Sequence, residues 1–393
     1  MTELLFCLSV YFAVHPFFVY PRSLIWIKRF TSERDRQINN ASSTSGFDTT
    51  HHSSTKLPRV ALVISTYNEA SVIGAKLQNS QALDYPSESL RFFVLSDACT
   101  DETVSIAQEF PKATVFRSTI RKGKSAVLEE FVPEIDADIL VFSDANSLYD
   151  PQAIRFLVAQ LADPMIGYVV GQQRYEDIED SPAAEAENVY WNRESWVKSL
   201  ESELGAVVGG DGAITAIRRS DYVPSHATDE SDFYVPLKLA IRGLSGVYEP
   251  RAFCQENASE HFAGQFFRKI RIVNRSLSST FRCLPALNPL RVGLFAYMLW
   301  SHKVLRWLLP VNLLLAAFCL GRLAAKGSLL FQLLAIPPFV VLLSAVLYLL
   351  PGFRRFRPIY LSFYFCSMNL AVLIGLISFI LGYRVTTWKP DRD

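Results

Sequence analysis

Apolar residues crowd the two ends of the chain, whereas the interior mixes charged, polar and apolar positions as a globular domain does. Leu4 to Tyr20 is nearly all apolar and aromatic. The basic residues Arg22, Lys28 and Arg29 follow it at once, in place of a small-residue cleavage site. We therefore expect residues 1–21 to form a membrane anchor. Because the segment is short for a span, a helix lying in the membrane interface is the alternative.

Three more apolar segments follow residue 290, and each is long enough to cross about 30 Å of hydrocarbon as a helix. After an interface helix that begins near residue 291, they cover about residues 304–323, 328–351 and 358–382. Arginines between the last two segments, at positions 354, 355 and 357, predict that this connection faces the cytosol. If the last segment spans fully, the tail at residues 384–393 lies outside.

Between the anchor and these segments, residues 22–57 are expected to form a basic, Ser- and Thr-rich tether, followed by a domain at residues 58–290. In the domain, short β-branched runs alternate with helical stretches. Strands are expected at residues 60–65, 92–95, 113–116, 139–142 and 166–170, and helices at 71–81, 100–110, 124–131 and 151–162. The alternation predicts an α/β fold with a mostly parallel, Rossmann-like sheet. Ligands of such sheets bind outside the carboxyl ends of the strands.

Composition and charge exclude several functions. The formal net charge of +1 gives no electrostatic case for a nucleic-acid partner. The six cysteines lack the spacing of a zinc site and fit a reduced, cytosolic domain. The stretch from Lys122 to Ser125 is not a Walker phosphate loop, because residue 118 is Ser where that loop needs Gly.

Polar residues gather at the ends of three predicted strands, at residues 65–69, 96–101 and 143–146. Because parallel strands end at one edge of a sheet, we expect these residues to converge on a ligand site. A single Asp in such a place, Asp101 for example, also serves as a helix cap. Asp144 and Asn146 can share Mg²⁺ or Mn²⁺ with phosphates, since hard cations prefer oxygen ligands. An Asx turn is the alternative for this pair.

Further candidates lie downstream of the last predicted strand. The glycine-dense turn at residues 208–214 lets the backbone approach a ligand closely. A burst of carboxylates at residues 229–232 precedes a predicted helix. It can supply a general base or only a charged first helical turn. One helical face then carries Arg268, Arg271 and Arg275, which suits a diphosphate or anionic lipid headgroups.

Taken together, these residues resemble the family 2 glycosyltransferases, in particular the membrane-integrated branch of cellulose, hyaluronan and poly-N-acetylglucosamine synthases. The resemblance covers nearly the whole chain after Pro58. In order, it rests on Thr66 to Glu69, Asp97 to Asp101, Gly123-Lys124, Phe142 to Asn146, Gly212 to Ile214, the carboxylates before Phe233, Gln265 to Lys269, and His302 to Trp307. It implies a GT-A fold and a hexosyltransferase-type enzyme. The implied reaction passes a sugar, with inversion, from a nucleotide-diphosphate sugar, expected to be UDP-linked, to a glycan or lipid-linked acceptor.

The resemblance also implies roles for single residues. Asp232 matches the catalytic base of the family. The residues implied to bind the nucleotide-sugar are Thr66, Tyr67, Glu69, Asp97, Lys124, Asp144 and Arg268. A divalent cation would be held by Asp144 and by Asn146, which stands where many members have a second Asp. The acceptor side would be formed by Asp211, Gly212 and Gln265.

The stretch Gln265 to Lys269 departs from the family pattern. Lys269 stands where processive members have the Trp of QxxRW, and its loss removes a platform for sugar stacking. Three interpretations stay open. The first is a polymer-forming enzyme of exopolysaccharide or surface-glycan synthesis, which could act with an export or accessory subunit. The second is a single-sugar transferase acting on a lipid carrier, and the third is a catalytically silent scaffold. A sugar nucleotidyltransferase has a similar sheet but no need of three membrane segments after its domain.

The end of the chain bears on topology. Val385 to Pro390 resembles a family tail expected on the cytosolic side, which requires the last apolar segment to lie partly in the interface or to re-enter. We therefore expect a multi-pass protein of the cell membrane with its catalytic domain in the cytosol and the lipid bilayer as a partner.

Overall fold

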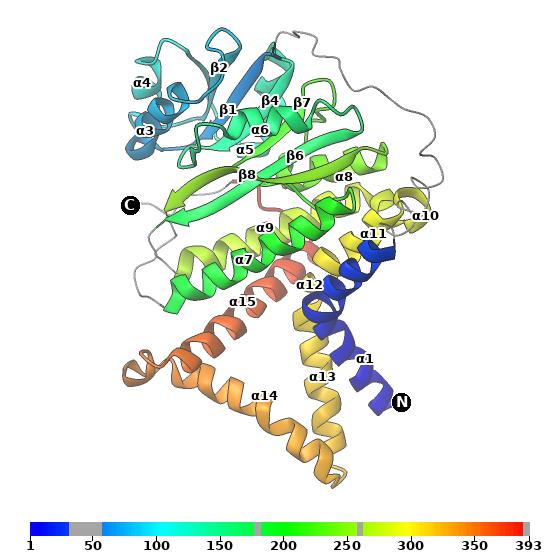
Figure 1. The fold of residues 1–393 in the computed structure, drawn as a ribbon. Helices are drawn as coiled ribbons and strands as arrows, with labels where there is room; N and C mark the ends of the chain where they lie inside the picture. Colours follow the sequence, from blue (N-terminus) through cyan, green and yellow to red (C-terminus); the bar gives the residue numbers. More distant parts are fainter. Residues whose placement is uncertain (31–56, 177–181, 258–261, 388–393) are drawn as a thin grey trace, which may run out of the picture.

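The computed structural model describes residues 1–30, 57–176, 182–257 and 262–387. Within these ranges, eight strands form one mixed sheet in the order β3-β2-β1-β4-β7-β6-β8-β5. The strands are β1 (Val60–Thr66), β2 (Leu90–Asp97), β3 (Ala113–Ser118), β4 (Ile139–Asp144), β5 (Leu148–Tyr149), β6 (Ile166–Glu176), β7 (Thr215–Arg218) and β8 (Ser245–Asn257). Helices flank the sheet, and long apolar helices project from one side of the domain (Figure 1). The expected α/β class and mostly parallel sheet are confirmed.

The parallel half of the sheet consists of β1, β2, β3 and β4. β1 pairs in parallel with β2 and β4, and β2 pairs in parallel with β3. Every residue of β1 is buried, as in a strand covered on both faces. Its side chains alternate between two separate cores. Ala61 and Val63 belong to one core, and Leu62 and Ile64 belong to the other.

The second half of the sheet was predicted less well. β7 runs antiparallel to both β4 and β6, and β8 runs parallel to β6. Neither β7, β8 nor the two-residue β5 was expected from the sequence. β7 is only four residues long, and β8 contains Pro250 and several charged residues, so neither has the alternating apolar pattern that predicts a strand.

The helices of the domain include the four predicted at residues 71–81, 100–110, 124–131 and 151–162, and one at residues 182–203 that was not expected from the sequence. They are α3 (Ala70–Gln81), α4 (Thr103–Gln108), α5 (Lys124–Phe131), α6 (Ala153–Gln160), α7 (Pro182–Glu203), α8 (Ser231–Ile241) and α9 (Phe262–Arg282). α4 begins later than residue 100, where it was expected. Oδ1 of Asp101 accepts a hydrogen bond from the amide of Thr103 at 3.1 Å, but the N-cap position of this helix is Glu102, so Asp101 is not the cap that was expected.

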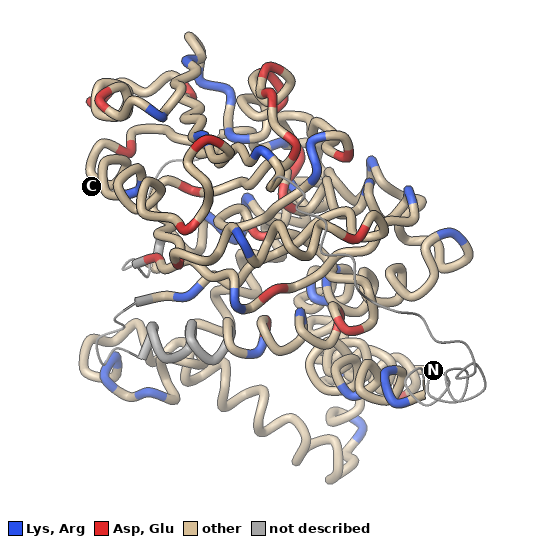
Figure 2. Tube along the Cα trace, turned by 45° about the horizontal axis from the view of Figure 1, so that its top comes forward, with Lys and Arg blue, Asp and Glu red and all other residues tan. Residues whose placement is uncertain are grey.

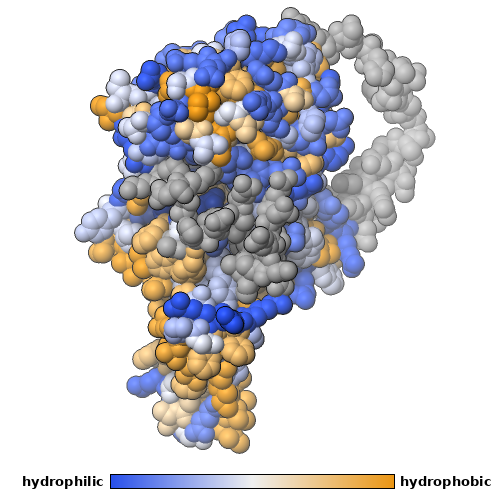
Figure 3. All heavy atoms as spheres, turned by 90° about the vertical axis from the view of Figure 1, so that its left-hand side faces the viewer, coloured by the Kyte–Doolittle hydropathy of each residue, from blue (hydrophilic) through white to orange (hydrophobic). Residues whose placement is uncertain are grey.

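Three helices are long and apolar enough, by length and composition, to cross a membrane: residues 2–30, α14 (Leu329–Leu347) and α15 (Arg357–Ile380). A fourth candidate is a bent pair. Residues 294–307 and α13 (Leu309–Ala324) meet at an angle of 62°. The segment expected at residues 304–323 is therefore broken near Leu308, two residues before Pro310. Hydrophobic residues gather on these helices, below the hydrophilic domain (Figure 3), and charged residues are sparse there (Figure 2).

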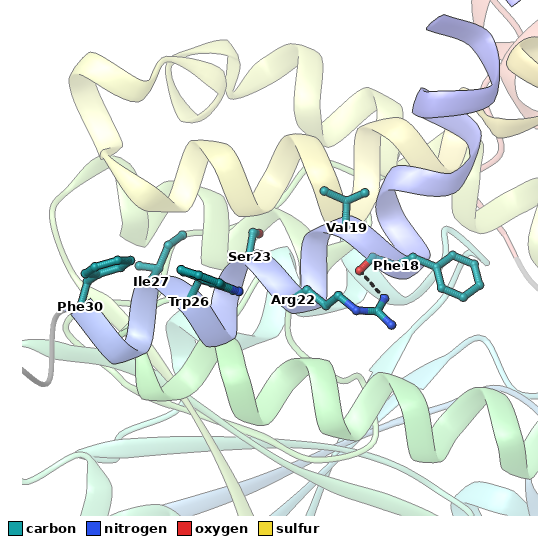
Figure 4. A pocket seen from close by; sticks show the side chains of 7 residues that line it. All are labelled: Phe18, Val19, Arg22, Ser23, Trp26, Ile27 and Phe30. Atoms are coloured by element: carbon teal, nitrogen blue, oxygen red, sulfur yellow. Dashed lines mark hydrogen bonds between the residues drawn. The ribbon is translucent and has the colours of Figure 1, made fainter. Parts of the chain in front are cut away.

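The N-terminal helix runs on to Phe30, beyond the boundary expected at residue 21. It comprises α1 (Thr2–Val14), a π-helical turn (His15–Val19) and a further helical stretch that turns along the domain (Figure 1). The last part carries a shallow apolar groove lined by Phe18, Val19, Arg22, Ser23, Trp26, Ile27 and Phe30 (Figure 4). Residues 22–30 thus belong to a helix rather than to the tether, and the rest of the tether lies outside the described residues.

We call the apolar helices at residues 2–30, 294–324, 329–347 and 357–380 the membrane-side helices. The core on one face of the sheet continues into several of them. It contains Tyr20 and Leu24 of the N-terminal helix, Trp307 of α12 (Leu305–Trp307) and Val372 of α15, together with residues of β1, β4 and α8. α15 lies along α9 (Figure 1). Asn274 of α9 donates hydrogen bonds to Ser378 and to the carbonyl of Tyr383, at 3.1 and 2.9 Å. The apolar helices are therefore packed onto the domain and not only joined to it by the chain.

Candidate active site

The carboxylate of Asp97 holds the loop before α5. It is buried at the end of β2, and its two oxygens accept hydrogen bonds from the amides of Lys122 and Gly123 at 2.7 and 2.8 Å. Gly123 has φ 93°, a conformation that favours glycine, and α5 starts at the next residue. Asp97 thereby brings Lys124, at the start of that helix, to the edge where the parallel strands end.

The residues after β1 form the neighbouring wall. Thr66 is buried, and its hydroxyl donates to the carbonyl of Leu95 at 3.2 Å. Glu69 is also buried, and its amide bonds the hydroxyl of Thr103. The guanidinium of Arg121 lies 3.6 Å from the ring centroid of Tyr67. Two of its nitrogens, Nε and Nη2, are buried and have no hydrogen-bond partner among the described residues. Arg121 was not among the residues predicted from the sequence.

Lys124, Asp144 and Asp232 converge on Gly212. Nζ of Lys124 lies 2.5 Å from Oδ1 of Asp144 and 3.2 Å from the carbonyl oxygen of Gly212. A Cβ placed on Gly212 would lie 2.9 Å from Nζ of Lys124, 3.3 Å from Oδ2 of Asp232 and 3.8 Å from Oδ2 of Asp144. These groups come from α5, the end of β4, the start of α8 and the turn before β7. Asp211 lines the same small cavity with Lys124, Gly212 and Asp232.

Asp232 has the electrostatic properties of a general base. Burial, followed by the negative charge of Glu230, raises the pKa of Asp232 to about 7, against the opposing charge of Lys124. Its Oδ1 is buried and has no hydrogen-bond partner among the described residues. A carboxylate with a free oxygen and a pKa near neutrality can accept a proton from an attacking hydroxyl. The amide of Gly210 donates to the carbonyl of Asp232 at 2.6 Å, which ties the glycine turn to this position.

The candidate metal ligands lie on one turn after β4. Asp144 is partly exposed, and Asn146 follows it by two residues on the turn closed by the bond from Ser147 N to Asp144 O, 3.3 Å. Among the described residues, no three His, Cys, Asp or Glu side chains gather in a way that could hold a metal by themselves. One carboxylate and one amide oxygen fit an ion that takes its other ligands from phosphates and water.

The arginines of α9 divide between two places. The carboxylates of Glu256, Asp144 and Asp211, with Tyr175, raise the pKa of Arg268 against the loss of solvation, so Arg268 lies within electrostatic reach of the site. Arg275 lies deeper. It bonds Ser125 at 2.7 Å and the carbonyl of Thr386 at 3.1 Å, and its Nε lies 3.1 Å from Glu230.

Two other features of the acceptor side lie farther along the chain. Gln265 accepts a hydrogen bond from Tyr364 of α15 at 3.3 Å. The described part of the tail reaches the domain, since a Cβ on Gly123 would lie 2.0 Å from the carbonyl oxygen of Thr386. The remaining tail residues of the resemblance, Trp388 to Pro390, lie outside the described residues.

Buried ion pairs of α7 were missed by the sequence reasoning. Nζ of Lys198 lies 3.4 Å from Oδ2 of Asp211, with both side chains buried. On the same helix, Glu194 and Glu201 are buried and both bond His302. The spacing of Glu194, Lys198 and Glu201 places them on one helical face. Charges on a helix usually face solvent, so this spacing alone gave no signal.

Most of the domain matches a known protein family. Residues 61–223 match the family model described as Glycosyl transferase family 2. The matched region belongs to this family. The candidate site lies partly within the matched region, which holds the strand ends and the glycine turn. The carboxylates at residues 229–232 and α9 follow it.

Two curated relatives are similar to this chain. Poly-beta-1,6-N-acetyl-D-glucosamine synthase of Staphylococcus aureus is 24% identical over 272 residues, which cover 64% of this chain and 65% of that protein. Beta-monoglucosyldiacylglycerol synthase of Synechocystis is 29% identical over 167 residues, which cover 40% of this chain and 33% of that protein. The chain thus spans just under two thirds of the length of the staphylococcal relatives that it matches.

A solved structure shows the same fold. The mannosyltransferase from Pyrobaculum calidifontis, in complex with GDP-Man and Mn²⁺, aligns with 96% of this chain and 99% of its own, with a TM-score of 0.66 and 22% identity. The alignment includes the apolar helices as well as the sheet. The GT-A fold expected from the sequence is confirmed.

Proposed function

We propose that the chain is an inverting glycosyltransferase that passes a hexose from a nucleotide-diphosphate sugar to an acceptor at the membrane. The observation that carries this proposal is the convergence of Lys124, Asp144 and Asp232 on Gly212. A cation, a carboxylate that suits a phosphate-bound metal, and a buried carboxylate with a raised pKa lie around one position without a side chain. The absence of a side chain at Gly212 lets these three groups approach one another closely.

Asp232 would act as the general base. Its free Oδ1 would take the proton of an acceptor hydroxyl while that oxygen attacks the anomeric carbon from the face opposite the departing nucleotide. This is a single displacement, which inverts the configuration and needs no covalent sugar intermediate. Asp211 and Gly212 lie on the acceptor side of the same cavity, and Gln265, held by Tyr364, would complete it.

The donor would lie along the strand ends. Tyr67, backed by Arg121, offers a flat surface for the nucleotide base, and Asp97, Thr66 and Glu69 line the neighbouring wall. Lys124 and Arg268 would stabilise the diphosphate. Asp144 and Asn146 would hold a Mg²⁺ or Mn²⁺ that, when bound, offsets the charge of the leaving nucleotide. The Pyrobaculum mannosyltransferase, whose complex contains GDP-Man and Mn²⁺, supports both a nucleotide-sugar donor and this cation.

The experiment that tests the function is a donor screen. Detergent-purified protein is incubated with a panel of UDP-, GDP- and dTDP-sugars, with and without Mn²⁺, and nucleotide release is measured. We expect release from one class of donor, UDP-sugars first, and dependence on the cation. If no donor releases nucleotide, the domain is a silent scaffold and the proposal is wrong.

Two acceptors are compatible with the similar proteins. The staphylococcal relative is named for a polysaccharide product and the Synechocystis relative for a glycolipid product. Lys269, in place of a stacking Trp, favours transfer of a single sugar to a lipid carrier over polymer synthesis. A ladder of product lengths made by the purified protein would eliminate the single-transfer version, whereas one labelled lipid species would support it.

We also propose that the domain and the tail lie on the cytosolic side of the cell membrane. In this topology, α13 and α14 form a hairpin, and α15 lies in the interface under α9. The packing of α15 on α9 and the contact between Thr386 and the loop at Gly123 support it. Single cysteines at Arg355 and Arg384, labelled in sealed right-side-out and inverted vesicles, should both react only in inverted vesicles.

A further inference from the structure

The buried charges on α7 connect two membrane-side helices to the glycine turn of the site. Glu194, Lys198 and Glu201 lie on one face of this helix, and all three are buried. Burying a charge costs free energy unless it is paired and hydrogen-bonded, so each partner of these residues is informative. The partners come from two directions: the membrane-side helices and the turn at residues 208–211.

On the membrane side, His302 lies between the two glutamates. Its Nδ1 is 2.5 Å from Oε1 of Glu201 and its Nε2 is 2.7 Å from Oε1 of Glu194. Each ring nitrogen of His302 is therefore within hydrogen-bonding distance of a buried carboxyl group of α7. The hydroxyl of Tyr20, on the N-terminal helix, also donates to Oε1 of Glu201, at 2.5 Å. Glu201 is thus held by residues of two different membrane-side helices.

The second glutamate anchors the same helix. Burial would raise the pKa of the Glu194 carboxyl, but the charges of His302, Arg306 and Lys303 hold it well below its ordinary value. Arg306 donates to Oε2 of Glu194 at 2.8 Å, and Lys303 lies 3.4 Å from Oε1. The segment from residue 302 to 306 therefore holds α7 at two points separated by two helical turns.

On the catalytic side, the same face of α7 holds the glycine turn. Oε2 of Glu201 accepts a hydrogen bond from the amide of Val208 at 3.1 Å. Asp211 follows Val208 by three residues, and its Oδ2 lies 3.4 Å from Nζ of Lys198. The side chain of Lys303 lies against Gly209, within 3.8 Å of where its Cβ would be. Both ends of the turn that presents Gly212 are thus fixed by side chains of α7, and one of these, Glu201, is also bound by the membrane-side helices.

We propose that Glu201 is a positioning residue for sugar transfer. Held by His302 and Tyr20, Glu201 fixes the position of the turn at residues 208–212. This inference rests on the proposed function. Glu201 touches no reacting group, and its effect passes through the backbone of Val208. The turn carries Gly212 and borders Asp232, so a small displacement changes the gap in which the acceptor attacks. Misplacing reacting groups by about 1 Å can cost about 100-fold in rate.

The test compares E201Q with E203Q as a matched control. Glu203 lies two residues away on α7 and forms an exposed ion pair with Lys28 at 2.6 Å. Full-length protein is assayed in native membrane vesicles that supply their own acceptor, with radiolabelled donor of the type selected by the screen. For E201Q we expect kcat for transfer to fall about 10- to 100-fold with an unchanged donor dissociation constant. E203Q should match the wild type in both.

Hydrogen exchange gives a readout that does not depend on activity. In E201Q, the amides of residues 206–212 should exchange faster than in the wild type, because the hydrogen bond from the Val208 amide to residue 201 is weakened. In E203Q, they should exchange at the wild-type rate. If E201Q exchanges at the wild-type rate and keeps the wild-type kcat, the positioning role is wrong. If the wild type turns over no donor while the exchange difference persists, the proposed function fails and the structural link stands.

A second variant covers failure of E201Q to fold. Y20F removes one hydrogen bond to Glu201 and keeps the buried ring. We expect kcat to fall about fivefold, the loss that matches one hydrogen bond, with donor binding unchanged. A Y20F protein with wild-type kcat and wild-type exchange at residues 206–212 would overturn the proposal. So would a Y20F protein in which donor binding and transfer decline by the same factor, since that is the result of general destabilisation.

Discussion

Nζ of Lys124 lies 2.5 Å from Oδ1 of Asp144, and the same ammonium donates to the carbonyl of Gly212. The lysine therefore connects the strand end proposed to bind the diphosphate with the turn proposed to border the acceptor. Coulombic attraction to Asp144 and Asp232 raises the pKa of Lys124 although burial opposes it, so the side chain is a fixed positive charge in the site.

Replacing Lys124 should reduce catalysis more than folding. K124M keeps the length and apolar stem and removes the charge that would stabilise the departing diphosphate. We expect kcat to fall about 100-fold, as for loss of one preorganised donor in other active sites. The neighbouring Lys122 pairs with Glu130 and provides the control. K122M should keep kcat within the error of the assay, and an equal loss in both variants would contradict the role given to Lys124.

The pH dependence of transfer should report Asp232. A general base works as the carboxylate, and its pKa is raised to about 7. Below that pH, kcat should fall about tenfold per pH unit, and above it kcat should be level. In D232N, residual transfer should lose this pH dependence while nucleotide-sugar binding, measured by calorimetry, stays intact. Transfer by D232N near the wild-type rate would show that another group is the base.

Glu230 offers a check on the cause of that shift. Its negative charge is the second contribution to the raised pKa, after burial. E230Q should therefore move the inflection of the pH profile to lower pH, towards the ordinary range of a carboxyl group. An unchanged inflection would mean that the profile does not report Asp232.

Gly212 should tolerate no side chain. In G212A the new methyl would lie 2.9 Å from Nζ of Lys124 and 3.3 Å from Oδ2 of Asp232, so one of these groups must shift. We expect kcat to fall about 10- to 100-fold, with little change in melting temperature. Gly321 of α13 has nothing within 4 Å of its added Cβ, and G321A is the control. An active G212A enzyme would place the sugar elsewhere.

The affinity for the divalent cation should depend on the residue at position 146. N146D adds a carboxylate to a turn that offers one carboxylate and one amide. Because carboxylates bind hard divalent cations more strongly than amides do, the Mn²⁺ concentration for half-maximal activity should fall. It is measured by titrating Mn²⁺ into chelator-treated protein at a fixed donor concentration. Identical titrations for N146D and the wild type would remove Asn146 from the cation site.

The sequence predicted those parts of the fold and the site that depend on local patterns. β1 is a continuous apolar run, and the polar residues at the carboxyl ends of β1, β2 and β4, among them Asp97 and Asp144, mark the ends of parallel strands. Asp232 needed more than pattern, because a carboxylate in a first helical turn is common. Its place came from the family resemblance, and its raised pKa depends on burial that no local spacing reveals.

What the sequence did not reveal depends on contacts between distant residues. Glu201 and His302 are separated by 101 positions, and each alone has the character of a surface residue. Burial of this pair follows from the packing of α7 against the membrane-side helices. The angle of 62° before α13 was missed because the apolar run continues through Leu308, although Pro310 lies in the first turn of the helix that follows.

The core on one face of the sheet contains Tyr20, Trp307 and Val372, which belong to the apolar helices at the two ends of the chain. A truncated form consisting of residues 58–290 alone would lose these side chains and expose the surface that they cover to water. Such a fragment should aggregate on expression. Soluble material for crystallisation will instead require the full chain in a detergent or nanodisc, and grafting the domain onto a foreign anchor will not preserve it.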